Sequence, residues 1–134
     1  MYKVVVTTFD KLSAKQLKYI RDNMTWGRGG LHDSLAAQDW RRVDKKIAFS
    51  AYEFVALVFD KEKIVNWTAI RKFKNNFELN SWTLEHYRRK GLMRLATAKL
   101  IRTKNLPKQK PILVYSHKVK KMLDSFGIKS WRVC

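Results

Sequence analysis

The sequence of 134 residues is poor in the residues that cross-link or punctuate a chain, with one cysteine, two prolines and five glycines. Because the single cysteine is Cys134, neither a disulfide within the chain nor a zinc site of the cysteine-rich kind can form. No apolar run approaches the roughly 20 residues that span a membrane, and the polar residues soon after the start do not suit a signal peptide. We therefore expect a cytoplasmic protein with no membrane partner.

Acidic residues are also scarce. Eleven Asp and Glu stand against 29 Lys and Arg, which gives a net charge of +18 and a pI near 10.3. An excess of this size is typical of proteins with an anionic partner, such as RNA, an acidic protein surface or a phosphorylated ligand. The alternative is a charged surface that only keeps the protein soluble. The oligomeric state is left open, with a homodimer as one option.

Core-forming residues are abundant by contrast. Apolar residues make up 46% of the chain and aromatic residues 13%, which excludes a disordered basic tail. The chain has no internal repeat and no linker-like segment, and its length suits one hydrophobic core. We therefore expect a single domain over residues 1–134.

The spacing of apolar residues predicts alternating strands and helices. Strands are expected at residues 2–7, 53–60, 64–73, 77–84, 111–116 and 128–134, and helices at residues 14–24, 91–102 and 117–127. The stretch "SAKQ", which starts at Ser13, is a capping box that opens the first helix. In the second helix, Leu92, Leu95 and Ala96 are expected to face the core. This order predicts an α/β (α+β) fold in which helices cover a central sheet.

The stretch "YRRKGLMRLATAKLI" (residues 87–101) is the clearest candidate for a binding site. A strand is expected to end at Leu84 and a helix to begin at Gly91. Helix N-termini present unpaired N–H groups and a partial positive charge, and a small residue there lets a phosphate approach closely. Four cations add full charges: Arg88, Arg89, Lys90 and Arg94. This arrangement suits a pyrophosphate, although a loop that is basic only because the protein is basic remains the alternative.

The longer stretch "TLEHYRRKGLMRLATAKLI" resembles the acetyl-CoA signature of the GNAT superfamily of N-acetyltransferases. That signature, Arg/Gln-x-x-Gly-x-Gly/Ala, follows a strand and opens a helix. Arg88 matches its first position and Gly91 its glycine, whereas Met93 stands where Gly or Ala is usual. The order of elements resembles that fold along nearly the whole chain, and "HKVKKMLDSFGIKSW" resembles its last helix and following strand. The resemblance implies a GNAT-like, mostly antiparallel central sheet flanked by helices.

The resemblance also implies acetyl-CoA as co-substrate. The cofactor-binding residues that it implies are Trp82, Thr83 and Leu84 beside the pantetheine arm, and Arg88, Arg89, Lys90, Gly91, Leu92, Met93 and Arg94 around the phosphates. No metal is expected, because the histidines share no ligand spacing.

Catalytic residues are harder to assign, and the candidates are Tyr115, Glu78 and Glu85. Tyr115 ends a strand, where it faces either the thioester or the core. Glu78 lies one residue out of register with the base of some family members, and one residue changes the face of a strand. Leu123 stands where the family often has a Tyr acid, and Ser116 where it often has Asn.

The sequence thus predicts an enzyme, an N-acetyltransferase that moves acetyl from acetyl-CoA directly to an amine on a macromolecule. The expected acceptor is an aminoacyl-tRNA, or a lysine or N-terminus of a protein, because the charge of +18 exceeds what one CoA requires. The alternative is a catalytically degenerate GNAT-fold module that binds nucleic acid or a partner protein through its basic surface. Residues 25–46 are expected to form a flexible loop and a short helix. Within them "WGRGG" (residues 26–30), which holds three of the five glycines, is either a loop over the acceptor or a plain connection.

Overall fold

The structure, a computed structural model, describes residues 1–24, 52–73, 76–103, 112–114, 116–128 and 130–132. The predicted loop at residues 25–46, the catalytic candidate Tyr115 and Cys134 lie outside these residues. The strands are β1 (Tyr2–Thr7), β2 (Tyr52–Asp60), β3 (Lys63–Phe73), β4 (Asn76–Thr83), β5 (Ile112–Val114) and β6 (Ser130–Arg132). The helices are α1 (Ala14–Asn23), α3 (Leu92–Thr103) and α4 (His117–Ser125), and two 3-10 turns are η1 (Phe9–Lys11) and η3 (Glu85–Tyr87).

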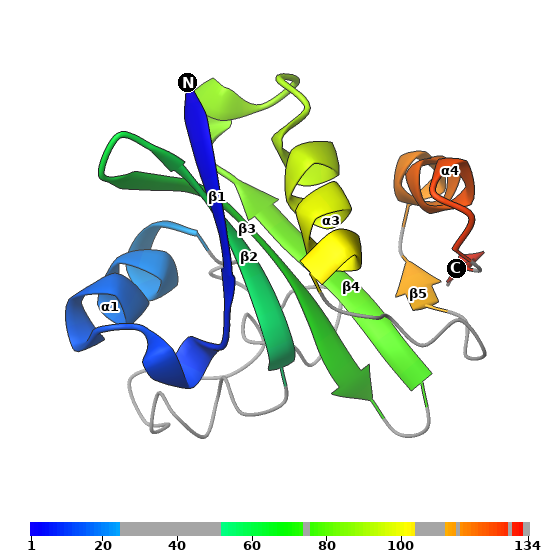
Figure 1. Ribbon diagram of the computed structural model, residues 1–134, viewed down its shortest axis with the longest axis horizontal. Helices are drawn as coiled ribbons and strands as arrows, with labels where there is room; N and C mark the ends of the chain where they lie inside the picture. Colours follow the sequence, from blue (N-terminus) through cyan, green and yellow to red (C-terminus); the bar gives the residue numbers. More distant parts are fainter. Residues whose placement is uncertain (25–51, 74–75, 104–111, 115, 129, 133–134) are drawn as a thin grey trace.

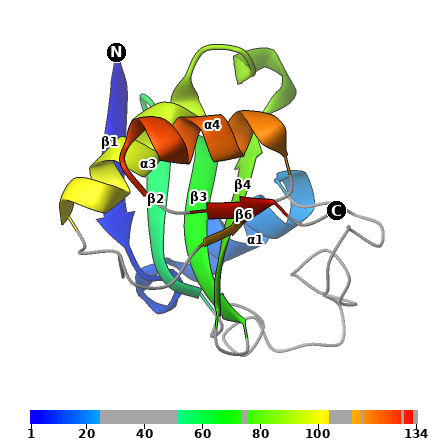
Figure 2. The same cartoon turned by 90° about the vertical axis from the view of Figure 1, so that its right-hand side faces the viewer.

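The strands form one six-stranded sheet in the order of the sequence. From β1 to β4 all neighbours are antiparallel, whereas β4, β5 and β6 run parallel to one another. Helix α1 lies on one face of the sheet, and α3 and α4 lie on the other (Figures 1 and 2). The predicted mixed, mostly antiparallel sheet with flanking helices is therefore confirmed.

The two faces follow from the alternation of side chains along a strand. On β3, Trp67 and Ala69 are buried with α1, and Ile70 is buried with α3 and α4. The Trp67 indole is 0% exposed, and its Nε1 donates to the Met24 carbonyl oxygen at 2.8 Å. The end of α1 is thereby fixed to the centre of the sheet.

The helix ends confirm the predicted signals. The Ser13 hydroxyl accepts from the Gln16 N–H, and the Gln16 side chain accepts from the Ser13 N–H, which completes the capping box. At the other end of the chain, Gly127 has a φ of +74°. The Gly127 N–H donates to the Asp124 carbonyl and the Ile128 N–H to the Leu123 carbonyl, the pattern of a Schellman motif.

Some boundaries and orientations differ from the predictions. Leu95 was expected in the core but is 38% exposed, because α3 turns Leu92, Ala96 and Leu100 toward the sheet. The last strand begins at Ser130 and not at residue 128, because Ile128 completes the cap of α4. Among the described residues no helix is long and apolar enough to cross a membrane.

The buried indole of Trp67 provides a test of the packing. Trp67→Phe removes ring volume from the core and leaves the Met24 carbonyl without its side-chain donor, so we expect a loss of about 2 kcal/mol in the free energy of unfolding. Urea denaturation of the variant and the parent measures this difference. A change below about 0.5 kcal/mol, the size typical of a surface substitution, would contradict this packing.

Candidate functional site

The sheet opens between β4 and β5. Among the described residues these strands pair at only two positions, Phe77 with Ile112 and Glu78 with Leu113. At the next position Val114 keeps its pairing with Arg132 of β6 but has no pairing with β4. Since β5 stays with β6, the residues of β4 from Leu79 to Thr83 pair with β3 alone as far as the described part of the chain shows (Figure 1).

The register shows which backbone groups face this opening. The Leu84 N–H donates to the Val65 carbonyl at 3.0 Å, in continuation of the β3–β4 register. In an antiparallel pair, residues alternate between those that exchange hydrogen bonds and those that do not. The N–H and C=O of Ser81 and Thr83 therefore point away from β3, into the opening. Among the described residues the Thr83 C=O accepts from Arg88 Nε at 3.1 Å, and the other three groups form a free edge to which an extended ligand can pair as a strand would.

Helix α3 begins at the outer end of this edge. The Leu95 N–H donates to the Gly91 carbonyl at 3.0 Å, so Gly91 is the N-cap residue. No acceptor for the amides of Leu92, Met93 and Arg94 lies among the described residues. A helix that begins after Gly91 with unpaired amides is what the sequence predicted, and the binding of an anion at these amides stays a prediction.

The backbone before the helix is unusual. Both Gly91, at a φ of +74°, and Arg89, at +65°, occupy the left-handed region. No heavy atom lies within 4 Å of a Cβ built on Gly91, so the space in front of the helix is open. Left-handed arginine is strained, and such strain concentrates at functional sites.

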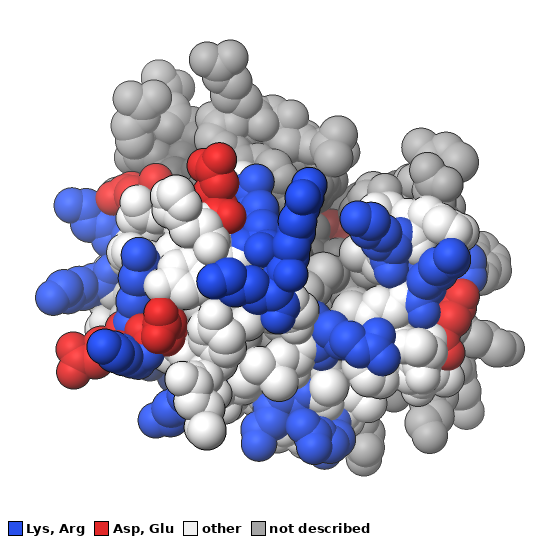
Figure 3. All heavy atoms as spheres, turned by 90° about the horizontal axis from the view of Figure 1, so that it is seen from above, with Lys and Arg blue, Asp and Glu red and all other residues white. Residues whose placement is uncertain are grey.

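The cations of this loop are held by aromatic rings and not by carboxylates. The Arg88 guanidinium lies 5.5 Å from the Trp82 ring centre, the Lys90 ammonium 5.5 Å from that of Tyr87, and the Arg94 guanidinium 4.9 Å from that of Phe126. None of these cations, nor Arg89, has an ion pair with a described residue, and all four are exposed. Figure 3 shows Lys and Arg side chains gathered at the centre of this face, with acidic side chains mainly toward its left and right sides. Their charge is therefore available to a ligand.

Two contacts that the sequence did not predict fix the loop to the sheet. The Tyr87 hydroxyl donates to Asp60 Oδ2 at 2.7 Å, which ties η3 to the end of β2, and this bond raises the pKa of Tyr87, with a further contribution from burial. Arg88 Nε donates to the Thr83 carbonyl at 3.1 Å, across the open edge. The bond from Tyr87 to Asp60 joins residues 27 positions apart and depends on the arrangement of the strands, so no local motif could have indicated it.

At three positions the sequence departs from the pattern that it resembles, and the residues found there have structural roles. The Met93 side chain is half-buried and packs against the core between the sheet, α3 and α4. Leu123 is 0% exposed in the same core. Ser116 is the N-cap of α4, where its hydroxyl accepts from the Val119 N–H at 3.1 Å. A larger residue at position 93 is thus accommodated by packing, without removing the amide.

The two acidic candidates lie at opposite ends of the free edge. Glu78 is 1% exposed, accepts a hydrogen bond from Asn80 Nδ2 at 2.8 Å, and lies where β5 is still paired. Its position in the strand, alternating with Phe77 and Leu79, places it on the face of α1. Glu85 is exposed in η3, beyond the end of β4. Roughly 16 Å of strand separate Glu78 from Thr83, so the two carboxylates cannot serve one reacting group.

A cavity of about 460 Å³ adjoins the site on the face of α1. It lies between α1 and the end of β4, and its lining includes Tyr19, Trp82, Glu85, His86 and Arg88. Three of these, Trp82, Glu85 and Arg88, are predicted site residues. The structure thus brings part of the predicted set together around one space.

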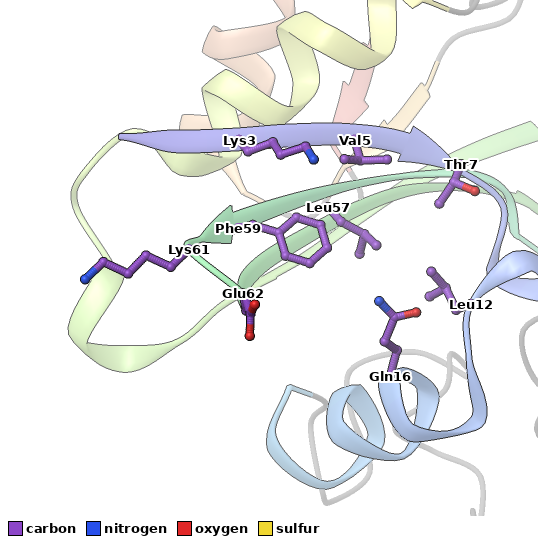
Figure 4. Close-up of a pocket in the computed structure, with 9 residues that line it drawn as sticks. All are labelled: Lys3, Val5, Thr7, Leu12, Gln16, Leu57, Phe59, Lys61 and Glu62. Atoms are coloured by element: carbon purple, nitrogen blue, oxygen red, sulfur yellow. The ribbon is translucent and has the colours of Figure 1, made fainter.

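A second cavity of about 370 Å³ lies between α1 and the edge of the sheet at β1 and β2 (Figure 4). Its lining includes Val5, Leu57 and Phe59, and Gln16, whose amide oxygen is already engaged in the capping box. It contains no predicted site residue. Among the described residues, no three His, Cys, Asp or Glu side chains are grouped as metal ligands.

Known proteins support this fold. No family model matches the sequence, and no curated protein matches it either. Solved structures do resemble it: Escherichia coli ElaA has a TM-score of 0.62 at 14% identity, covering 94% of this chain and 86% of that chain. A probable acetyltransferase from meticillin-resistant Staphylococcus aureus has a TM-score of 0.58 at 15% identity, covering 96% of this chain and 90% of that one.

A third similar structure is the ribosomal-protein-S18-alanine N-acetyltransferase of E. coli, with a TM-score of 0.53 at 14% identity over 93% of this chain and 77% of that chain. These similarities show that the chain has the GNAT fold, as the resemblance in its sequence predicted. The site is defined by this chain's own residues.

The left-handed backbone at Arg89 gives a prediction that separates strain from charge. Arg89→Gly and Arg89→Ala both remove the guanidinium, but only glycine adopts a φ of +65° without strain. We expect the glycine variant to be more stable than the alanine variant by about 1 kcal/mol in the free energy of unfolding, measured by denaturant titration. Equal stabilities, or a more stable alanine variant, would contradict the loop conformation.

Proposed function

We propose that the protein is an acetyl-CoA-dependent N-acetyltransferase whose acceptor is an amine on a macromolecule. The observation that carries this proposal is the meeting of two features at one place: the free edge of β4 and the unpaired amides at the start of α3. A ligand with an extended arm and a phosphate at one end could pair with the edge of β4 and place its phosphate at the amides of α3. Arg88, Arg89, Lys90 and Arg94 supply the charge that a phosphorylated co-substrate needs.

Two groups of residues would bind the two parts of acetyl-CoA. The amides of Leu92, Met93 and Arg94 hold the diphosphate, and the open space at Gly91 lets it approach. The backbone of Ser81 and Thr83 pairs with the arm, beside Trp82 and Leu84. The arm thereby runs from Gly91 toward the closed end of the opening at Glu78.

When bound, acetyl-CoA supplies an activated acetyl group as a thioester. The acceptor nitrogen forms a bond to the carbonyl carbon, the carbon–sulfur bond breaks, and the nitrogen loses a proton while the thiolate gains one. The protein must take the first proton and stabilise the developing charges.

Glu78 is the better placed of the described carboxylates to receive the proton. Because the arm separates the diphosphate from the thioester, the reacting carbonyl lies far from Gly91 and from nearby Glu85. Glu78 marks the deep end of the opening, and Asn80 fixes one of its carboxylate oxygens. Tyr115 stays a predicted catalytic residue, and Leu123, at the position where the family often has a Tyr acid, has no group that can protonate the thiolate.

The acceptor approaches from the face of α1, the face of the sheet on which Glu78 lies. This route does not cross α3 or α4, which cover the other face of the sheet. The exposed cations of the site attract an anionic macromolecule and steer it there. The net charge of +18 supports the same class of acceptor, an aminoacyl-tRNA or an acidic protein.

The two described glycines provide a matched test of co-substrate binding. Gly91 and Gly127 both have a φ of +74° and open space at the Cβ position, so Gly91→Asp and Gly127→Asp impose similar backbone costs. Only the carboxylate at position 91 repels a diphosphate at the amides of α3. We expect Gly91→Asp to weaken acetyl-CoA binding by about tenfold or more and Gly127→Asp to leave it within about twofold, by calorimetry.

Equal losses in the two variants would place the binding site elsewhere. Absence of acetyl-CoA binding by the parent protein at millimolar ligand would overturn the proposed function.

A further inference from the structure

A buried polar network lies under the free edge of β4. It joins Asn66 and Thr68 of β3, both 0% exposed, to Ser81 and Thr83 of β4. Asn66 Nδ2 donates to Thr83 Oγ1 at 2.8 Å and to Ser81 Oγ at 3.2 Å, and Thr68 Oγ1 donates to Asn66 Oδ1 at 2.9 Å. Thr68 Oγ1 and Ser81 Oγ lie 2.9 Å apart.

The number of protons fixes the direction of each bond. A hydroxyl has one proton, and an amide oxygen can only accept. Since Thr68 gives its proton to Asn66 Oδ1, Ser81 must give its own to Thr68 Oγ1. Both protons of Asn66 Nδ2 are also used, on Ser81 and Thr83. Thr83 is thus an acceptor within the network, and no acceptor for its own proton lies among the described residues.

Thr83 is also the member of the network nearest the predicted phosphate loop. It ends β4, its side chain is partly exposed, and its carbonyl is held by Arg88 Nε. A fully satisfied buried network holds its members rigidly. The Thr83 oxygen is therefore held in place by Asn66, and its proton is left for an acceptor outside the network, at the point where the opening meets the loop.

We propose that Asn66 is a positioning residue that sets the Thr83 hydroxyl as a hydrogen-bond donor to an acceptor atom of the bound acyl-pantetheine arm. This inference rests on the proposed function and adds a side-chain contact to the backbone pairing. Asn66 does not touch the ligand. Asn66 donates its two amide protons to Ser81 and Thr83 within the network. The Thr83 hydroxyl therefore accepts from Asn66 and can donate its own proton only to an atom outside the network.

Calorimetric titration of the full chain with acetyl-CoA and with CoA tests this inference. Thr83→Val keeps the shape of the side chain but removes the donor, and we expect about fivefold weaker binding, the size of one hydrogen bond. Thr83→Ser keeps the donor and should bind within about twofold of the parent. Thr7→Val on β1, outside the network, serves as the control for the same change and should bind as the parent does.

Asn66→Asp tests the positioning role. A carboxylate cannot donate, so the Thr83 proton turns inward, and affinity should fall as far as in Thr83→Val. The double variant should then lose little more than either single variant. Should the buried carboxylate prevent folding, the Thr83 variants decide the question, because that side chain is partly exposed.

The outcomes are separable. A loss shared by CoA and acetyl-CoA supports a contact with the arm, whereas a loss for acetyl-CoA alone would place the acceptor atom on the acetyl group, at the other end of the arm, and overturns this inference. Unchanged binding by Thr83→Val, or an equal loss in Thr83→Ser, overturns this inference and leaves the proposed function intact. No binding by the parent protein overturns both.

Discussion

Within the described residues, β4 pairs with β5 only as far as Glu78, and the candidate site is built on this early end of the pairing. Had β5 continued alongside, the N–H and C=O groups of Ser81 and Thr83 would be spent within the sheet. Because β5 stays with β6 instead, those groups face a space that ends at the first turn of α3. The divergence of the two parallel strands β4 and β5 therefore creates the opening, which leads to the first turn of α3.

The rest of the site is organised around keeping this edge open and rigid. Tyr87 and Arg88 tie the loop to Asp60 and to the Thr83 carbonyl, and the network of Asn66 fixes the side chains beneath. The cations are oriented by aromatic rings, which position a charge without neutralising it. A site built this way is organised before its ligand arrives, which reduces the cost of binding.

Local signals in the sequence predicted the elements well. The capping box at Ser13, the left-handed Gly127 and the glycine at the start of α3 were correct because each depends on residues a few positions apart. The prediction that Leu95 faces the core was wrong, because the side of α3 that contacts the sheet is set by the tertiary structure. The bonds of Tyr87 to Asp60 and Asn66 to Thr83 join residues 27 and 17 positions apart, so only the strand register reveals them.

Acetyl transfer can be followed by incubating the purified protein with radiolabelled acetyl-CoA and a total cell extract, and then separating protein, RNA and small molecules. We expect the label to enter protein or RNA, to be lost with Gly91→Asp and to be kept with Gly127→Asp. Label that enters neither macromolecule, from a protein that binds acetyl-CoA, would contradict this expectation.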